Sequence, residues 1–91
     1  MIKPEDVPSE VIDFVVKIME YIAKRNNWRL SSNRERVRLL IAHLIANWAN
    51  YGHPYCPCRL ERIRENICPC VWAFEEIKNE GKCKCRLFYA E

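Results

Sequence analysis

The stretch that decides the fold of this chain is residues 56–85, CPCRLERIRENICPCVWAFEEIKNEGKCKC. It holds all six cysteines of the protein, in three Cys-x-Cys pairs separated by nine and then twelve residues. The pairs are Cys56 with Cys58, Cys68 with Cys70, and Cys83 with Cys85. Such clustering predicts a centre that several thiolates reach together. Structural zinc and iron–sulfur clusters each take four ligands of this kind, so two sulfurs remain for other chemistry.

The Cys-x-Cys spacing suits a shared centre. In an extended chain, residues two apart point to the same side, and in a turn the two sulfurs diverge so that one ligates while the other sits close by. Pro57 and Pro69 fix one backbone angle in two of the pairs and stiffen them. The spacing alone leaves open which four sulfurs are ligands.

The chain length and the net charge limit which functions are expected. Ninety-one residues predict a single domain, 1–91, with a small core to which a bound centre or partner would contribute stability. The net charge of +3 is mild and makes nucleic-acid binding an unfavoured prediction.

The N-terminal sequence predicts a cytoplasmic protein. Residues 1–10 contain four charged side chains and no apolar segment of the signal-peptide type. No apolar run is long enough to span a membrane, so no membrane association is expected. In a reducing cytoplasm, clustered cysteines favour metal or redox chemistry over a framework of disulfides.

The first predicted helix covers residues 9–25. Ser9 is the expected N-cap, and Asn26 and Asn27 are expected to end the helix. Apolar residues at helical spacing predict its buried face. That face comprises Val11, Val15, Ile18 and Ile22, widened by Phe14, Met19 and Tyr21.

The second predicted helix begins at a capping box formed by Ser32 and Glu35. It ends near Gly52, which permits a left-handed C-cap, and Pro54 prevents continuation. Its expected buried face comprises Val37, Leu40, Ile41, Leu44, Ile45 and Trp48. We expect the two helices to pack antiparallel as an apolar platform for the cysteine segment.

The remaining segments predict short elements. Leu60, Ile63 and Ile67 have the spacing of a short helix, residues 74–80 a second one ended by Gly81, and residues 87–89 an extended or irregular tail. The predicted fold class is therefore mostly α, a small single domain of short helices with cysteine-bearing loops wrapped around a shared metal centre.

The three cysteine motifs also resemble a known family. Residues 56–59 (CPCR), 68–71 (CPCV) and 83–88 (CKCRLF), with a looser likeness at 21–25 and 51–52, are similar to the catalytic chain of ferredoxin-thioredoxin reductase. The motif likeness covers roughly residues 51–89. The spacers differ from the chloroplast form, and Lys84 stands where that form has His, which favours a divergent member such as an archaeal one.

The resemblance implies a role for each cysteine. Cys56, Cys68, Cys70 and Cys83 would bind a [4Fe-4S] cluster, and Cys58 and Cys85 would form an adjacent redox-active disulfide. Cys58 would be the attacking thiol and Cys85 the one that interacts with the cluster. Ferredoxin would be the electron donor, and a thioredoxin or glutaredoxin-like protein the acceptor. Whether a second subunit is needed stays open.

Cations surround the two candidate redox cysteines in the sequence. They are Arg59, Lys82, Lys84 and Arg86, and nearby cations lower the pKa of a thiol unless they are simply solvated. Lys84 or His53 would replace the proton-shuttling His of the family, whereas His43 lies within the second helix and is expected to be structural.

A basic patch covers residues 24–38, from the end of the first helix to the start of the second. It comprises Lys24, Arg25, Arg29, Arg34, Arg36 and Arg38, against the single acid Glu35. It would steer an acidic ferredoxin, contact nucleic acid weakly, or form a plain solvated helix start. Two further alternatives stay open for the whole chain: a zinc-bound structural or interaction module with two spare thiols, and a simple iron–sulfur electron carrier.

Overall fold

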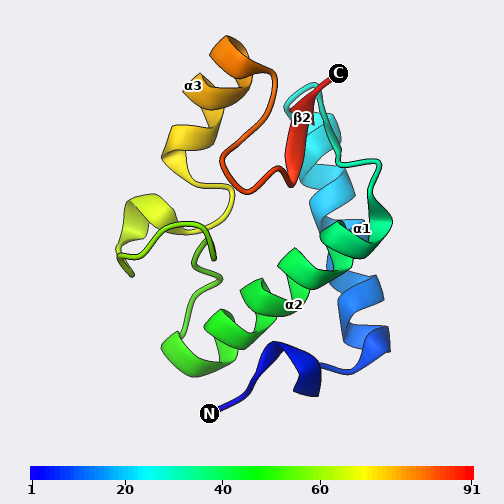
Figure 1. Ribbon diagram of the computed structural model, residues 1–91, viewed down its shortest axis with the longest axis vertical. Helices are drawn as coiled ribbons and strands as arrows, with labels where there is room; N and C mark the ends of the chain where they lie inside the picture. Colours follow the sequence, from blue (N-terminus) through cyan, green and yellow to red (C-terminus); the bar gives the residue numbers. More distant parts are fainter.

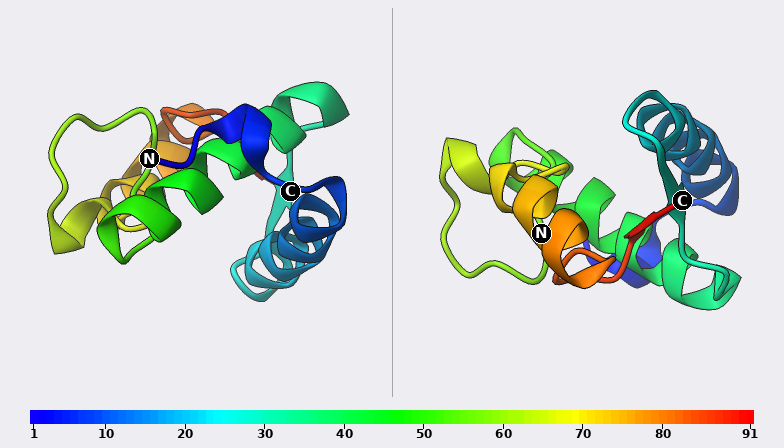
Figure 2. Two further views of the ribbon diagram at one scale, coloured as in Figure 1. Left: turned by 90° about the horizontal axis from the view of Figure 1, so that it is seen from below. Right: turned by 90° about the horizontal axis from the view of Figure 1, so that it is seen from above.

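Two helices form the platform on which the cysteine segment packs. In the computed structural model, which describes residues 1–91, a 3-10 turn η1 (Pro4–Asp6) precedes helix α1 (Ser9–Arg25), and α2 (Arg34–Tyr51) follows. The bounds of α1 are as predicted. The two helices are in contact, but α2 crosses α1 at a steep angle instead of running back alongside it (Figures 1 and 2), so the predicted antiparallel pairing is wrong.

Both predicted N-caps are wrong by one residue. Pro8 occupies the N-cap position of α1, and the Ser9 hydroxyl instead accepts a hydrogen bond of 2.8 Å from Nη2 of Arg38. Asn33 caps α2, and its Oδ1 accepts the backbone N–H of Arg36 at 3.1 Å. Asn is as good a cap as Ser and lies one residue nearer the helix, so it displaces Ser32 from that role.

The buried face of α1 differs in part from the prediction. Val15, Met19 and Ala23 are buried, with Ile12, Val16 and Ile22 packed beside them. Four apolar residues of the predicted stripe face solvent, namely Val11, Phe14, Ile18 and Tyr21, and the Phe14 side chain is 66% exposed. Both sides of this helix are apolar, so the sequence pattern alone does not select the side that packs.

Most of the predicted face of α2 is buried. Val37, Leu40, Ile41 and Leu44 lie in the core, with Ile45 packed against it, whereas Trp48 is 52% exposed. Gly52 adopts φ 86°, and its N–H donates to the carbonyl of Trp48 at 2.9 Å. This left-handed cap ends α2 as predicted.

A two-stranded antiparallel sheet pairs the segment that follows α1 with the C-terminal tail. Strand β1 (Trp28–Leu30) pairs with β2 (Phe88–Ala90) in the register Trp28 with Ala90 and Leu30 with Phe88. Strand β1 was not predicted. Strand β2 corresponds to the predicted extended tail, shifted by one residue. The pairing buries Phe88, which is only 1% exposed. The centroids of the Phe88 and Trp28 rings lie 5.3 Å apart.

The segment between the first two cysteine motifs is mostly loop. Only a 3-10 turn η2 (Arg64–Asn66) forms, and Leu60 is 97% exposed, so the predicted short helix is wrong. Its three apolar residues face too little protein to offset the ordering of a helix. The loop 57–63 projects at one end of the molecule (Figure 2).

Helix α3 (Val71–Glu80) closes the cysteine segment. It begins three residues before the predicted start and buries Ala73 and Ile77. Gly81 ends it with φ 81°, as predicted. The mostly helical fold class is confirmed, with the small sheet in addition, and none of the helices is long and apolar enough to cross a membrane.

Candidate functional site

Backbone hydrogen bonds place the first two cysteine motifs side by side. Tyr55 and Ile67 form an antiparallel bridge. The N–H of Cys56 donates to the carbonyl of Asn66 at 2.8 Å, and the N–H of Cys68 donates to the carbonyl of Pro54 at 3.0 Å. These hydrogen bonds hold the first two cysteine motifs in a fixed register.

The side chain of Asn66 organises the loop between those motifs. It is buried, its Nδ2 donates to the carbonyl of Glu61 at 2.9 Å, and its Oδ1 accepts from Nε1 of Trp72 at 2.9 Å. A buried amide with partners on both sides fixes its surroundings, because losing either partner leaves an unpaired polar group. Asn66 therefore ties the loop to α3.

The third motif is a tight turn held by β2. The N–H of Cys83 donates to the carbonyl of Phe88 at 3.0 Å, and the N–H of Phe88 points back to the Cys83 sulfur at 3.4 Å. Arg86 adopts φ 61° within the turn. From α2, Nη2 of Arg36 donates to the carbonyl of Cys85 at 2.9 Å, which anchors the turn to the platform.

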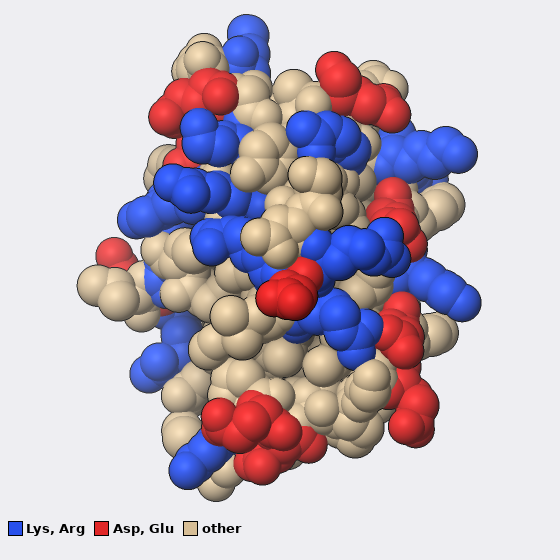
Figure 3. Space-filling view, turned by 45° about the vertical axis from the view of Figure 1, so that its right-hand side comes forward, with Lys and Arg blue, Asp and Glu red and all other residues tan.

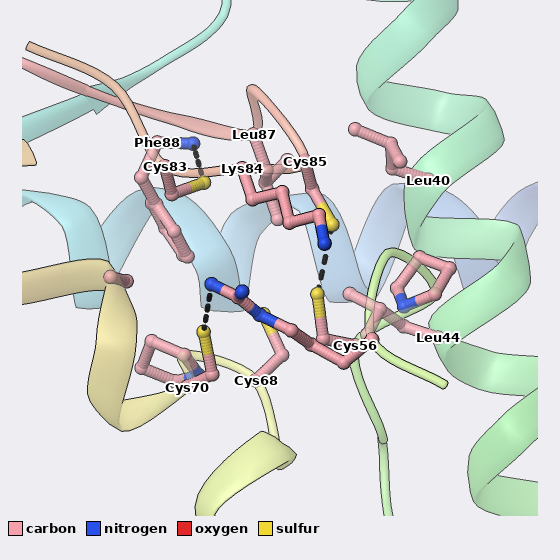
Figure 4. Close-up of a pocket in the computed structure, with 14 residues that line it drawn as sticks. Leu40, Leu44, Cys56, Cys68, Cys70, Cys83, Lys84, Cys85, Leu87 and Phe88 are labelled. Carbon is pink, nitrogen blue, oxygen red and sulfur yellow. Dashed lines mark hydrogen bonds between the residues drawn. The ribbon is translucent and has the colours of Figure 1, made fainter. Parts of the chain in front are cut away.

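Five of the six cysteines line one small cavity (Figure 4). They are Cys56, Cys68, Cys70, Cys83 and Cys85. The cavity has a volume of about 20 Å³, and its apolar walls come from α2, α3 and β2. Cys58 is not part of the lining and is half-buried. The structure therefore gathers five cysteines around the cavity, with Cys58 packed beside them outside the lining.

The sulfurs of Cys56 and Cys85 are in direct contact at 2.8 Å. All six cysteines are free thiols, and no disulfide joins Cys58 to Cys85. The disulfide implied by the resemblance therefore stays a prediction. Cys85 is buried among the cavity sulfurs, and Cys58 is the more exposed of the two.

Burial and neighbouring sulfurs oppose ionisation of three thiols in the cavity. Hydrogen bonding to Cys70 lowers the pKa of Cys56, but the contact with Cys85 and burial outweigh it and raise that pKa to about 11. Hydrogen bonding to Cys56 and burial raise the pKa of Cys70, and burial followed by the charges of neighbouring sulfurs raises the pKa of Cys68. These thiols require a cationic centre to become thiolates together.

The predicted flanking cations differ in their placement. Arg59 and Lys84 both line the cavity, and Lys84 is otherwise exposed. Arg86 is exposed and Lys82 half-buried, and neither belongs to the lining. Of the four cations, two therefore reach the cysteine site.

Neither histidine lies in the cavity wall. His53 is exposed and packs edge-on against Tyr55, with ring centroids 5.9 Å apart. His43 is exposed on α2. Lys84 is thus the closer of the two candidates for the position of the family's His.

Four of the six residues of the predicted basic patch line one groove. Figure 3 shows a belt of Lys and Arg side chains across one face of the molecule. A broad groove of about 720 Å³ lies between α1, β1 and the start of α2, and Lys24, Arg29, Arg34 and Arg38 line it together with Lys17. Arg36 leaves the patch, because its guanidinium binds the cysteine turn.

Sequence reasoning missed three supports of the site: Arg36, Asn66 and Glu76. The Oε1 atom of Glu76 accepts from Nη2 of Arg59 at 2.8 Å and from the backbone N–H of Lys84 at 3.2 Å. A signal existed for Glu76, since it lies next to Ile77 and three residues after Ala73, on the buried side of α3. For Asn66 the sequence held no such signal.

The donor set of the cavity consists of thiols, the kind of ligand that binds an iron–sulfur cluster. No three Cys, His, Asp or Glu side chains converge closely enough to hold one metal ion. Thiolates are the usual ligands of iron–sulfur clusters, and five thiols from three separate turns face one apolar space. The cavity now has room for about one water molecule, so its loops would move outward around a cluster.

A small helical domain whose cysteine turns surround a common cavity is a candidate metal-dependent redox protein. The family model of the ferredoxin thioredoxin reductase catalytic beta chain matches residues 5–91. The chain belongs to this family. Membership supports a function as a disulfide-reducing oxidoreductase, and the family is associated with iron–sulfur centres. No curated protein matches the chain.

Proposed function

We propose that this protein is an iron–sulfur disulfide reductase that passes electrons from ferredoxin to a thioredoxin-like protein. One observation carries the proposal: five cysteines line one cavity, while the sixth, Cys58, is half-buried outside that lining. A structural zinc module would have no use for a half-buried thiol outside the set that lines the cavity. A simple electron carrier would not need one either.

Four of the cavity cysteines would hold the cluster. By motif they are Cys56, Cys68, Cys70 and Cys83, and each belongs to the lining. A bound [4Fe-4S] cluster would supply one-electron transfer next to a disulfide that needs two electrons. Leu40, Leu44 and Phe88 line the same cavity and would limit the access of water to it.

Cys58 and Cys85 would carry out thiol–disulfide exchange. The Cys58 thiolate attacks the disulfide of the partner, so a bond forms between the two proteins and the second partner sulfur leaves as a thiolate. Cys85 then attacks the Cys58 sulfur. The Cys58–Cys85 disulfide forms, and the partner leaves with both of its sulfurs reduced. Two electrons and two protons restore the two thiols, the electrons coming singly from two reduced ferredoxins.

Lys84 would assist these steps. Its side chain lines the cavity between the two cysteines of the last motif. An ammonium group at the cavity wall would donate a proton to a leaving sulfur. This role would fall to Lys84 rather than to His53, whose ring packs against Tyr55 outside the cavity.

The groove between α1 and β1 would receive the acidic electron donor. Its five cations outnumber its three acids: the cations are Lys17, Lys24, Arg29, Arg34 and Arg38, and the acids are Asp13, Glu20 and Glu91. Opposite charge on two surfaces raises the rate of encounter more than the final affinity. The groove and the cysteine turn are linked through α2, which carries both Arg34 and Arg36.

A turnover assay tests the function. The purified protein is mixed anaerobically with reduced ferredoxin and an oxidised thioredoxin, and free thiols are counted over time. The proposal predicts thiol formation that stops when ferredoxin is left out and is absent in a Cys58→Ser variant. Thiol formation that persists in this variant would contradict it.

A further inference from the structure

Arg59 and Glu76 form the better shielded of the two ion pairs in the molecule. Nη2 of Arg59 lies 2.8 Å from Oε1 of Glu76, and the two side chains are only 16% and 22% exposed. In the other pair, Arg38 and Asp13 are 40% and 59% exposed. A shielded pair is held more firmly, because solvent and salt screen it less.

The guanidinium of Arg59 also faces the cysteines. It lines their cavity, and its Nη2 lies 3.8 Å from the sulfur of Cys70. Its Nε is buried and has no hydrogen-bond partner. An unpaired buried N–H costs free energy, so an acceptor bound beside Arg59 would stabilise the site.

Glu76 fixes the direction of that guanidinium. The same Oε1 atom that binds Arg59 also accepts the backbone N–H of Lys84, between Cys83 and Cys85. Glu76 thus joins the residue after the first motif to the turn of the third. Breaking this junction would release Arg59 and loosen the turn together.

We propose that Arg59 is a positioning residue that tunes the redox centre, donating N–H groups to sulfur in the cavity, with Glu76 setting its orientation. This inference rests on the proposed function, since it concerns the centre held by the cavity cysteines. Reduction adds negative charge to that centre. A fixed cation and N–H donors stabilise the reduced form, and hydrogen bonds to sulfur are among the factors that set such potentials.

The chain offers a matched control for Arg59. Arg62 lies in the same loop, is exposed, and places its guanidinium over the Tyr51 ring at 4.1 Å. It does not line the cavity. Arg59→Gln and Arg62→Gln therefore remove the same charge, one inside the cavity wall and one outside it.

Redox titration of the iron-loaded variants measures the effect. We expect Arg59→Gln to lower the equilibrium constant for reduction about tenfold, which is a negative shift of about 59 mV for a one-electron couple. Arg62→Gln should leave the potential nearly unchanged. Arg59→Lys, which keeps the charge but loses the planar fork, should fall between Arg59→Gln and the wild type.

Two variants of Glu76 separate charge from positioning. Glu76→Gln keeps an oxygen that accepts from Arg59 and removes a negative charge, so the potential should rise or stay the same. Glu76→Ala removes that charge as well, but it also releases Arg59, so its potential should lie below that of Glu76→Gln. A purely electrostatic effect of Glu76 would give both variants the same potential.

Each outcome bears on the proposal. Equal potentials for Arg59→Gln, Arg62→Gln and the wild type, at equal iron content, would overturn it. Loss of iron from both Arg59 variants but not from Arg62→Gln would give Arg59 a role in assembly and would also overturn it. A wild-type protein that binds no iron would instead overturn the proposed function, which iron analysis detects before any titration begins.

Discussion

The sulfur atoms of Cys56 and Cys85 lie 2.8 Å apart, although the two residues are 29 positions apart in the sequence. This contact joins the first and last cysteine turns at the wall of the cavity. It places Cys85 against a proposed cluster ligand, which is where the cluster-facing member of the redox pair is required. Cys58, two residues beyond Cys56, lies outside the lining of the same cavity.

The roles of the two redox cysteines can be separated by trapping. In a Cys85→Ser variant, the mixed disulfide between Cys58 and a thioredoxin should accumulate, because Cys85, the thiol that would release the reduced partner, is absent. In a Cys58→Ser variant no adduct should form. Mass spectrometry of each variant after mixing with oxidised thioredoxin measures this. A trapped adduct in Cys58→Ser would reverse the two assignments, and loss of iron from either variant would make that residue a ligand.

Removal of the cluster should loosen one segment selectively. The loop 57–63 projects from the molecule and has no regular structure, so we expect trypsin to cut after Arg62 much faster in iron-free protein. Cleavage within α1, after Lys17, should stay slow in both forms. Equal cleavage rates at Arg62 in the two forms would mean that the cluster does not order this loop.

The tail residue Phe88 should matter more for stability than its position near the chain end suggests. It is almost fully buried, and Phe88→Ala should lower the free energy of unfolding by about 3–5 kcal/mol. Leu60→Ala, at a residue that is almost fully exposed, should change it by less than about 0.5 kcal/mol. Denaturant unfolding followed by circular dichroism compares the two. Similar effects for both would place the core elsewhere.

The groove cations should govern the encounter with ferredoxin. Neutralising Lys24 and Arg34 together should slow association about tenfold at low salt, and the difference should shrink as salt is added. Neutralising Lys3 and Lys78, which do not line the groove, removes the same charge as a control. Stopped-flow measurements give the rates. Equal slowing in both variants would show a response to net charge rather than to the groove.

Local signals in the sequence predicted the helices well and their faces less well. The bounds of α1 and the glycine caps at Gly52 and Gly81 follow from residue types that act within a few positions. The packed side of α1 does not, because apolar residues occupy two of its sides. The β1–β2 pairing depends on contacts between segments far apart in the sequence, and two three-residue strands carry too little pattern to reveal it.

The candidate site shows the same division. The cysteines were evident from their clustering, and five of them meet at one cavity. The residues that hold their turns were not evident. Arg36 belongs by sequence to a basic patch, yet its guanidinium binds the carbonyl of Cys85. Such roles depend on where a long side chain is directed by tertiary packing, which the spacing of charges along the chain does not encode.

The metal content of anaerobically purified protein tests the central claim most directly. The account predicts a brown protein with about four iron and four sulfide ions per chain, as one [4Fe-4S] cluster requires. Iron, acid-labile sulfide and zinc are measured on the same sample. A colourless protein that contains one zinc ion and no sulfide would contradict the account.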